Sequence, residues 1–215
     1  MSPQEALHEY AGWFGKIPTL GDFVRRNLPE SFVEPWDAWL SEELWQAQLA
    51  LTDDWSQTWQ RVPMWYFALG AEVVDELSWQ GVLVPSVDRV GREFPLTIAL
   101  SQGRHTAARG AQWWGALGEL ARRAVGPDGS ADLLDEALAA CAGEPAGLAR
   151  DHGRSACAAE PDRETPGAGT SSWWRADGGE RHEATALMLA GLPRGERFYA
   201  ELICACFTRP FELLR

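Results

Sequence analysis

The sequence has no hydrophobic run that approaches the roughly 20 apolar residues of a membrane-spanning helix. Its first ten residues carry Glu5 and Glu9 and no long apolar stretch, so no secretory signal is visible. Cysteine is also scarce, with four in 215 residues. We therefore expect a cytoplasmic protein that does not insert into a membrane and that keeps its thiols reduced.

Positive charge is scarce as well. The chain has 19 lysines and arginines against 31 aspartates and glutamates, which gives a net charge of -12 and a pI of about 4.8. The phosphate backbone of a nucleic acid and the surface of an anionic membrane would both be repelled by this charge. Unless a local basic patch overrides the total, we expect no nucleic-acid partner.

The sequence signatures of common enzyme classes are missing. There is no Gly-x-Ser-x-Gly elbow of a serine hydrolase, no Walker loop and no Gly-x-Gly-x-x-Gly that follows a strand. None of the four histidines has a neighbouring nucleophile in the sequence: His8, His105, His152 and His182. We therefore expect no catalytic residues, and an enzyme that assembles its site only in space is the least favoured alternative.

Cys204 and Cys206 are the only close pair among the cysteines. On a helix, residues two apart point about 200° apart and cannot hold a metal together, whereas on a strand they would share a face. The spacing of Phe198, Leu202 and Cys206 favours a helix, so we interpret both cysteines as packed thiols. We expect no bound metal and no cofactor.

Apolar and aromatic side chains, in contrast, are abundant. Hydrophobic residues make up 46% of the chain, and twelve of the residues are tryptophans. A chain of this length can form one large domain that buries roughly 70% of the surface its unfolded form exposes. Tryptophan is common both in cores and in binding interfaces, so the count alone does not separate these roles. We expect residues 1–215 to form a single domain.

Hydrophobic periodicity predicts an irregular alternation of strands and helices. The first long helix begins with Ser31 and Glu34, which have the spacing of a capping box, and Asp53 is placed to cap the next helix. Residues 143–170 contain almost no large apolar side chains and predict a long surface loop. Helices are expected at 31–51, 53–60, 106–125, 130–141 and after Gly195, and strands at 10–16, 65–69, 81–87, 94–100, 172–176 and 183–190.

These helices need a sheet on which to bury their apolar faces. The connection between the strands at 81–87 and 94–100 is short, so we expect these two strands to be antiparallel neighbours. The order of elements favours the α/β class. We predict a single three-layer α/β/α sandwich with a mixed, partly antiparallel sheet.

Charged residues gather in two predicted turns. The first turn follows an aromatic run and contains Pro18, which fixes φ, and Gly21, which permits unusual backbone conformations. Asp22 and Arg25 follow it, one helical turn apart if that segment is helical. The second turn lies between the strands at 81–87 and 94–100. Together the two turns carry Lys16, Asp22, Arg25, Arg26, Asp88, Arg89 and Arg92.

This cluster has two interpretations. In the first, the two turns meet at one edge of the sheet and form a recognition patch, to which Trp13 or Phe14 adds apolar area. Arginine suits such a patch because its planar guanidinium binds carboxylates or carbonyl oxygens at two points. In the second, Asp22 and Asp88 pair with the arginines and brace the turns. The interpretations are compatible, because arginines that point outward can bind a partner while others brace the fold.

Three segments that include these turns occur in one order along the chain. They are GKIPTLGDFVRR, SFVEPWDAWL and GVLVPSVDRVGREFPLT, and WWRA followed by GLP forms a weaker fourth. In these segments the chain resembles the N-terminal domain of the TagF family, bacterial proteins associated with the type VI secretion system. The resemblance covers most of the chain, with residues 104–170 least constrained, and it implies the same three-layer fold.

The resemblance also implies a function. Members of the family act as post-translational repressors of secretion, and the implied partner is an FHA-domain scaffold protein of the system. Some relatives carry a PP2C-type phosphatase domain, for which this chain has no room, so we expect no phosphatase activity. A structural adaptor of the membrane-proximal assembly is the alternative from another class: its loss would lower secretion, whereas loss of a repressor would raise it.

Overall fold

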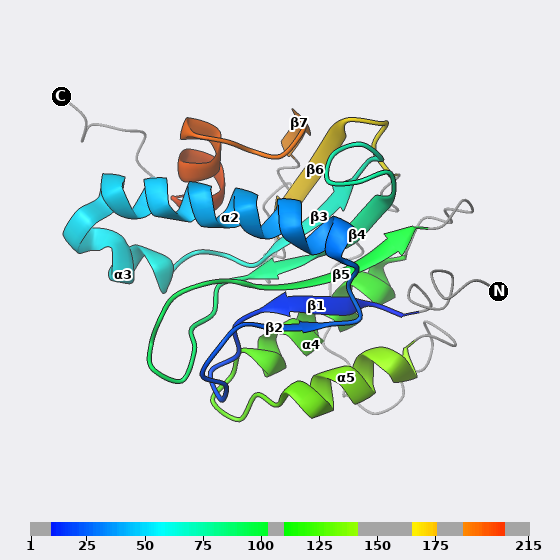
Figure 1. The fold of residues 1–215 in the computed structure, drawn as a ribbon, viewed down its shortest axis with the longest axis horizontal. Helices are drawn as coiled ribbons and strands as arrows, with labels where there is room; N and C mark the ends of the chain where they lie inside the picture. The colour runs from blue at the N-terminus through cyan, green and yellow to red at the C-terminus, as the bar shows by residue number, and fades with distance from the viewer. Residues whose placement is uncertain (1–9, 103–109, 142–164, 176–186, 205–215) are drawn as a thin grey trace.

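The structure, a computed structural model, describes residues 10–102, 110–141, 165–175 and 187–204. Its centre is a seven-stranded sheet in the order β2-β1-β5-β4-β3-β6-β7, in which every pair of neighbours is antiparallel (Figure 1). The strands are β1 (Gly12–Gly15), β2 (Val24–Arg26), β3 (Trp65–Leu69), β4 (Ser78–Val84), β5 (Leu96–Gln102), β6 (Thr170–Arg175) and β7 (Leu187–Ala190).

The α/β class is confirmed, but the expected mixed sheet is wrong. Parallel neighbours need a crossover of a dozen or more residues, usually through a helix. Here β1 and β2, β3 and β4, and β4 and β5 are joined directly by loops, so each pair reverses direction. The segment that carries the long helix after β2 leads to β3, which pairs with β4 and β6 and is not a neighbour of β2.

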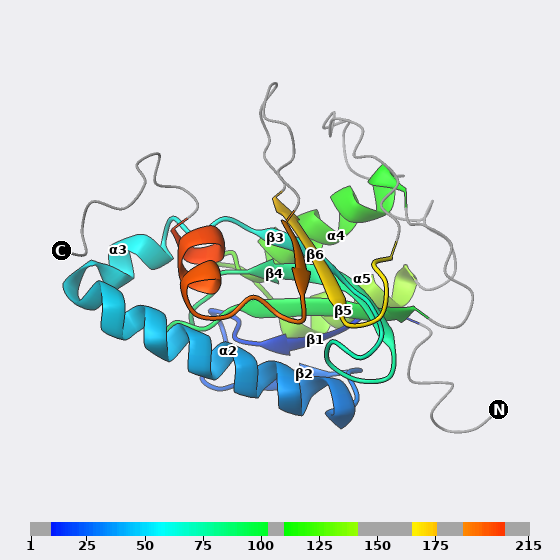
Figure 2. The ribbon, with the colours of Figure 1, turned by 90° about the horizontal axis from the view of Figure 1, so that it is seen from above.

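Helices pack against both faces of this sheet. One face is covered by α2 (Glu30–Leu51), α3 (Trp55–Trp59) and the π-helical segment η3 (Phe198–Ile203), and a 3-10 turn, η1 (Thr52–Asp54), joins the first two. The other face is covered by α4 (Ala111–Ala124) and α5 (Ala131–Ala140). Figure 2 shows α2 and η3 side by side on their face of the sheet. The sheet therefore divides the apolar interior into two clusters.

The cluster under α2 is mainly aromatic. The buried face of α2 repeats at helical spacing, which places Trp36, Trp39 and Leu40 against the sheet. Trp36 packs on the rings of Phe67 and Trp173, with centroid distances of 5.0 and 6.2 Å. Burying such rings removes a large apolar area from water. The helix thus forms because this stripe can be buried, and it ends at Leu51 as the sequence predicts.

The start of α2 differs from the prediction. The expected capping box of Ser31 and Glu34 is wrong, because α2 begins one residue earlier with Pro29 at the N-cap position and no side-chain cap. The Ser31 hydroxyl instead donates a hydrogen bond to Asp75, with an O–O distance of 3.0 Å. Asp53 likewise caps no helix: it lies within η1, and the helix that follows has no side-chain cap. Tertiary contacts therefore override the local capping pattern.

The opposite cluster follows the prediction more closely. Trp113, Trp114 and Leu117 of α4 are buried against the sheet. Ser130 caps α5 as expected, because its hydroxyl oxygen accepts a hydrogen bond from the backbone N–H of Leu133. Gly118 permits a close approach of α4 to β3, since a Cβ at this position would lie 2.2 Å from the Tyr66 hydroxyl oxygen.

Several expected boundaries shift or lie outside the described residues. The strand expected at 81–87 runs from Ser78 to Val84, and the one expected at 94–100 runs from Leu96 to Gln102. Thr170, the last residue of the expected loop at 143–170, begins β6. The rest of that loop up to residue 164 lies outside the described part of the chain, as do 183–186 of the expected strand at 183–190, the four histidines, Cys157 and Cys206.

Candidate functional site

The candidate site lies where the β1–β2 loop (residues 16–23) meets the β4–β5 loop (residues 85–95). The backbone N–H of Arg89 donates to the carbonyl oxygen of Leu20 at 2.8 Å, and the Arg92 side chain donates to the carbonyl oxygen of Gly21 at 2.7 Å. The β1–β2 loop is also tied to the α4–α5 connection, because the Thr19 hydroxyl donates to a backbone carbonyl there at 2.6 Å. We call these two loops together with β2 the charged edge.

A buried carboxylate holds the charged edge together. The Asp88 side chain is fully buried and accepts from the guanidinium Nε of Arg92 at 2.6 Å and from the ammonium of Lys16 at 3.2 Å. It also accepts from the backbone N–H groups of Val90 and Arg92 at 3.0 and 2.9 Å. Asp88 therefore closes its own loop and connects that loop to the end of β1.

These contacts set the charge state of Asp88. Burial on its own would raise the pKa of the Asp88 carboxyl, because it disfavours the ionised form. The hydrogen bonds from Arg92, Lys16 and the backbone N–H of Val90 outweigh burial and hold the pKa well below its usual range. Asp88 is therefore ionised in the folded protein at neutral pH.

Lys16 is also buried, and its ammonium is paired within the fold. Only 4% of Lys16 is exposed, and its ammonium lies 3.2 Å from Asp88, 3.4 Å from the carbonyl oxygen of Arg92 and 4.8 Å from the centre of the Phe23 ring. A buried ammonium that lost its counter-charge would pay a large desolvation cost. Lys16, Asp88 and Arg92 thus contact one another and brace the two loops, as the second interpretation of the cluster expects.

Trp13 and Arg26 face the side of the sheet that α4 and α5 cover. The Trp13 indole N–H donates to Asp135 of α5 at 2.6 Å, and the Arg26 guanidinium lies 3.4 Å from the same carboxylate. Trp13 is completely buried in the cluster beneath α4 and α5. The expectation that Trp13 or Phe14 adds apolar area to a binding patch is therefore wrong, because the alternation of β1 directs both rings into the two cores.

The remaining charged side chains face solvent. Asp22 accepts a hydrogen bond from the backbone N–H of Phe23 at 2.8 Å, which caps the turn. Arg25 and Arg89 are exposed, and neither has an ion-pair partner within the described ranges. The Arg89 guanidinium lies beside Gly21, where a Cβ would lie 3.4 Å from it. Two of the predicted residues are thus free to bind.

Two apolar residues of the charged edge escaped the sequence analysis. Phe23 is 44% exposed although it packs on the rings of Phe14 and Phe94, and Val90 at the tip of its loop is 69% exposed. The signal that could have identified them is an apolar residue directly beside charged ones in a turn: Phe23 follows Asp22, and Val90 follows Arg89. They provide the apolar area that Trp13 does not.

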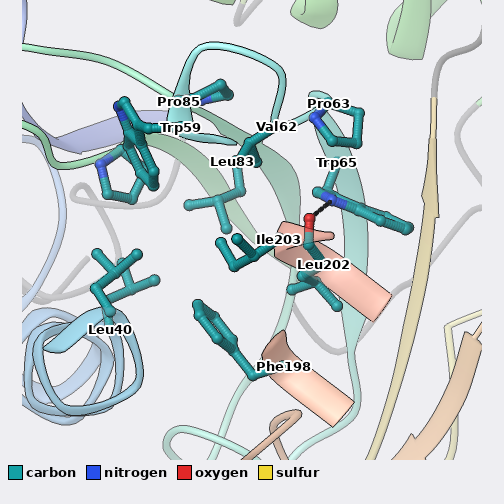
Figure 3. Close-up of a pocket in the computed structure, with 12 residues that line it drawn as sticks. Leu40, Trp59, Val62, Pro63, Trp65, Leu83, Pro85, Phe198, Leu202 and Ile203 are labelled. Atoms are coloured by element: carbon teal, nitrogen blue, oxygen red, sulfur yellow. Dashed lines mark hydrogen bonds between the residues drawn. The ribbon is translucent and has the colours of Figure 1, made fainter. Parts of the chain in front are cut away.

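A small crevice lies on the α2 side of the sheet. It lies between α2, α3 and η3, and its wall includes the indole of Trp65, whose N–H donates to the carbonyl oxygen of Leu202 at 3.1 Å (Figure 3). None of the described residues that line it has a charged or hydroxyl side chain. Its lining is Leu40, Leu44, Trp59, Val62, Pro63, Trp65, Leu83, Pro85, Pro95, Phe198, Leu202 and Ile203.

Within the described ranges, no three His, Cys, Asp or Glu side chains lie close enough together to hold a metal ion. No helix there is both long and apolar enough to span a bilayer.

A family model matches residues 12–141 and describes the TagF N-terminal domain, type VI secretion system-associated. The chain belongs to this family. The matched TagF segment contains both loops of the charged edge. It ends at Cys141, the C-cap residue of α5. The predicted family and its association with type VI secretion are thereby confirmed.

One solved structure extends the TagF comparison beyond the matched segment. The crystal structure of PA0076 from Pseudomonas aeruginosa PAO1 superposes on this chain with a TM-score of 0.67 at 26% sequence identity. The superposition covers 95% of this chain and 98% of PA0076. A comparison with curated proteins finds no match. The similarity to PA0076 therefore extends beyond residue 141.

Proposed function

We propose that this TagF-family protein is a non-enzymatic, post-translational repressor of type VI secretion that binds a scaffold component of the system, an FHA-domain protein, in the cytoplasm. Family membership supports the association with type VI secretion. The observation that carries the binding mechanism is the pair Arg25 and Arg89, which lie exposed and without ion-pair partners in the described part, next to the exposed Phe23 and Val90.

The geometry of the charged edge suits a binding surface. Lys16, Asp88 and Arg92 fix the two loops before any partner arrives, so little conformational entropy remains to be lost on binding. Each free guanidinium can then form two parallel hydrogen bonds to a carboxylate or to backbone carbonyl oxygens of the partner. In this proposal the charges that pair with one another, Lys16, Asp88 and Arg92, brace the loops, and the exposed arginines without an ion-pair partner in the described residues bind the scaffold.

The repressor needs no chemistry of its own. If it occupies the surface through which the scaffold makes its assembly contacts, the scaffold cannot promote formation of the secretion machine. In this proposal the sheet, with helices on both faces, is the middle of a three-layer scaffold that holds the charged edge rigid.

We expect deletion of the gene to raise type VI secretion in a strain that is able to secrete, because the scaffold is then free to assemble. The measurement is the amount of a secreted tube protein in the culture supernatant. Complementation with the wild type should lower secretion again, whereas Arg25→Ala/Arg89→Ala should not restore repression.

The matched control is Arg122→Ala/Arg123→Ala, which removes two exposed arginines from α4, on the face of the sheet opposite α2. It should complement as well as the wild type. A fall in secretion after deletion would contradict repression and would favour a structural adaptor, since loss of an assembly component removes secretion.

A further inference from the structure

Trp45 differs from every other tryptophan in the protein. All twelve tryptophans lie within the described residues, and eleven of them are buried, whereas Trp45 is 54% exposed. An exposed tryptophan presents a large apolar area to water, and tryptophan is enriched among residues that dominate binding surfaces. Since the cores already contain the other eleven, packing of the described fold does not explain the position of Trp45.

Trp45 has an apolar neighbour one helical turn away. Leu49, at i+4 on α2, is 55% exposed, so the two side chains form one apolar strip on the outer face of the helix. The residues that precede and follow on this face, Ser41 and Gln48 among them, are exposed as well. The strip therefore lies opposite the buried face that contains Leu44.

The surroundings of this strip are acidic. Residues 27–60 contain no lysine or arginine. Glu42 lies one turn before Trp45 on α2, and Asp53 lies in η1, four residues after Leu49 in the sequence. Both acids are exposed. A segment that covers the strip should therefore combine apolar side chains with positive charge, because a second acidic surface would be repelled.

The chain itself passes close to this end of α2. The segment before η3 is fixed to α2, because the Trp39 indole donates to the carbonyl oxygen of Pro193 at 2.8 Å and the backbone N–H of Gly195 donates to Glu43 at 2.7 Å. Ile203, which directly precedes Cys204, lines one crevice with Leu44 of α2 and Trp59 of α3. Cys204 thus follows a residue that lies beside the C-terminal half of α2.

Residues 205–215, which follow Cys204 and lie outside the described part, have the required composition. They contain four large apolar side chains, and their two arginines outnumber their one acid: Phe207, Phe211, Leu213, Leu214, Arg209, Arg215 and Glu212. An extended chain advances roughly 3.3 to 3.6 Å per residue, whereas the helix from Thr52 back to Trp45 rises only about 1.5 Å per residue. The segment is therefore long enough to reach the strip.

We propose that residues 205–215 bind across the outer face of α2, with their apolar side chains on Trp45 and Leu49 and their arginines near Glu42 and Asp53. The exposed strip and the segment are then complementary parts of one chain. This proposal is independent of the charged edge and of any role in secretion. In this proposal Trp45, which packs in neither core, is covered by residues 205–215.

The test is backbone hydrogen exchange of the full-length protein, followed by mass spectrometry of its peptides. In the wild type, peptides from 205–215 should exchange at least about tenfold more slowly than a free synthetic peptide of the same sequence, because bound amides are protected. In Trp45→Ala/Leu49→Ala the exchange should rise to within about twofold of the free peptide. Leu133→Ala, which removes a similarly exposed leucine from α5, should leave the protection unchanged.

Peptides from β3, β4 and β5 report in the same experiment whether each variant keeps its fold. Wild-type exchange equal to that of the free peptide would overturn the proposal. So would protection that survives Trp45→Ala/Leu49→Ala, since the segment would then bind elsewhere, for example at the crevice of Figure 3. Protection that disappears on dilution would also overturn it, because the strip would then bind a second copy.

Discussion

Replacing Trp36 with alanine is expected to lower the free energy of unfolding by about 4 kcal/mol, the largest stability effect of any single substitution we propose. Trp36 is fully buried, and its indole N–H donates to the Thr97 hydroxyl of β5 at 2.9 Å. Alanine would leave a cavity among the rings of Phe32, Phe67 and Trp173 and would remove the partner of a buried hydroxyl.

Urea unfolding followed by circular dichroism measures this effect. The graded variant is Trp36→Phe, which keeps an aromatic ring in the site and should therefore cost clearly less than Trp36→Ala. A loss below about 1.5 kcal/mol for Trp36→Ala would contradict the description of this cluster as the main core, because a well-packed tryptophan cannot be removed so cheaply.

Replacing Asp88 with asparagine is expected to lower the thermal midpoint by roughly 10 °C at pH 7. The substitution keeps the size of the side chain but leaves the buried Lys16 without its counter-charge. It also weakens the contact with Arg92, which connects the two loops. The matched control is Asp22→Asn, which removes an exposed carboxylate from the neighbouring loop and should shift the midpoint by less than about 2 °C.

The effect of Asp88→Asn should depend on pH in one direction. The pKa of Asp88 is lower in the folded protein than its ordinary value of 3.8, so its ionised form stabilises the fold fully above that value. This contribution is lost as the pH falls from about 4 through the folded-state pKa. The difference between wild type and Asp88→Asn should therefore be constant from pH 5 to 7 and should narrow below pH 4. An equal difference at pH 7 and pH 2.5 would show that Asp88 acts through something other than its charge.

The sequence predicts best those elements whose apolar pattern is long. The stripe that includes Trp36, Trp39 and Leu40 identifies α2 and its end at Leu51, because 22 residues leave little ambiguity in the period. The strand Trp65–Leu69 is predicted with its correct bounds, since it is aromatic and bounded by Pro63 and Gly70.

Short elements and contacts between distant residues could not be predicted in this way. The segment around Arg25 is the edge strand β2 and not a helical turn, and three residues with two arginines carry no clear strand signal. The position of Trp13 depends on Asp135, which is 122 residues away in the sequence. Ser31 likewise binds Asp75 in place of its local capping partner.

The sequence identified the charged residues of the candidate site. It did not show which of them brace the loops and which are exposed without an ion-pair partner. Pattern alone cannot tell that Lys16 is buried whereas Arg89 is exposed, because both lie in polar turns. That difference depends on how two loops pack against each other although β2, α2, α3, β3 and β4 separate them in the sequence. Among the exposed members, Arg25 and Arg89 have no ion-pair partner within the described residues, so we propose these two for direct contact with a partner.

The most direct test of the central claim is calorimetric titration of the purified FHA-domain scaffold from the same bacterium with this protein. We expect the wild type to bind and Arg25→Ala/Arg89→Ala to bind roughly 100-fold more weakly, because each arginine would lose charge-assisted hydrogen bonds worth about a factor of ten. Arg122→Ala/Arg123→Ala should bind within about twofold of the wild type. Equal binding by wild type and Arg25→Ala/Arg89→Ala, with both folded by circular dichroism, would contradict the claim that the charged edge is the binding surface. If the wild type does not bind, the proposal that this protein represses secretion by binding the scaffold is contradicted.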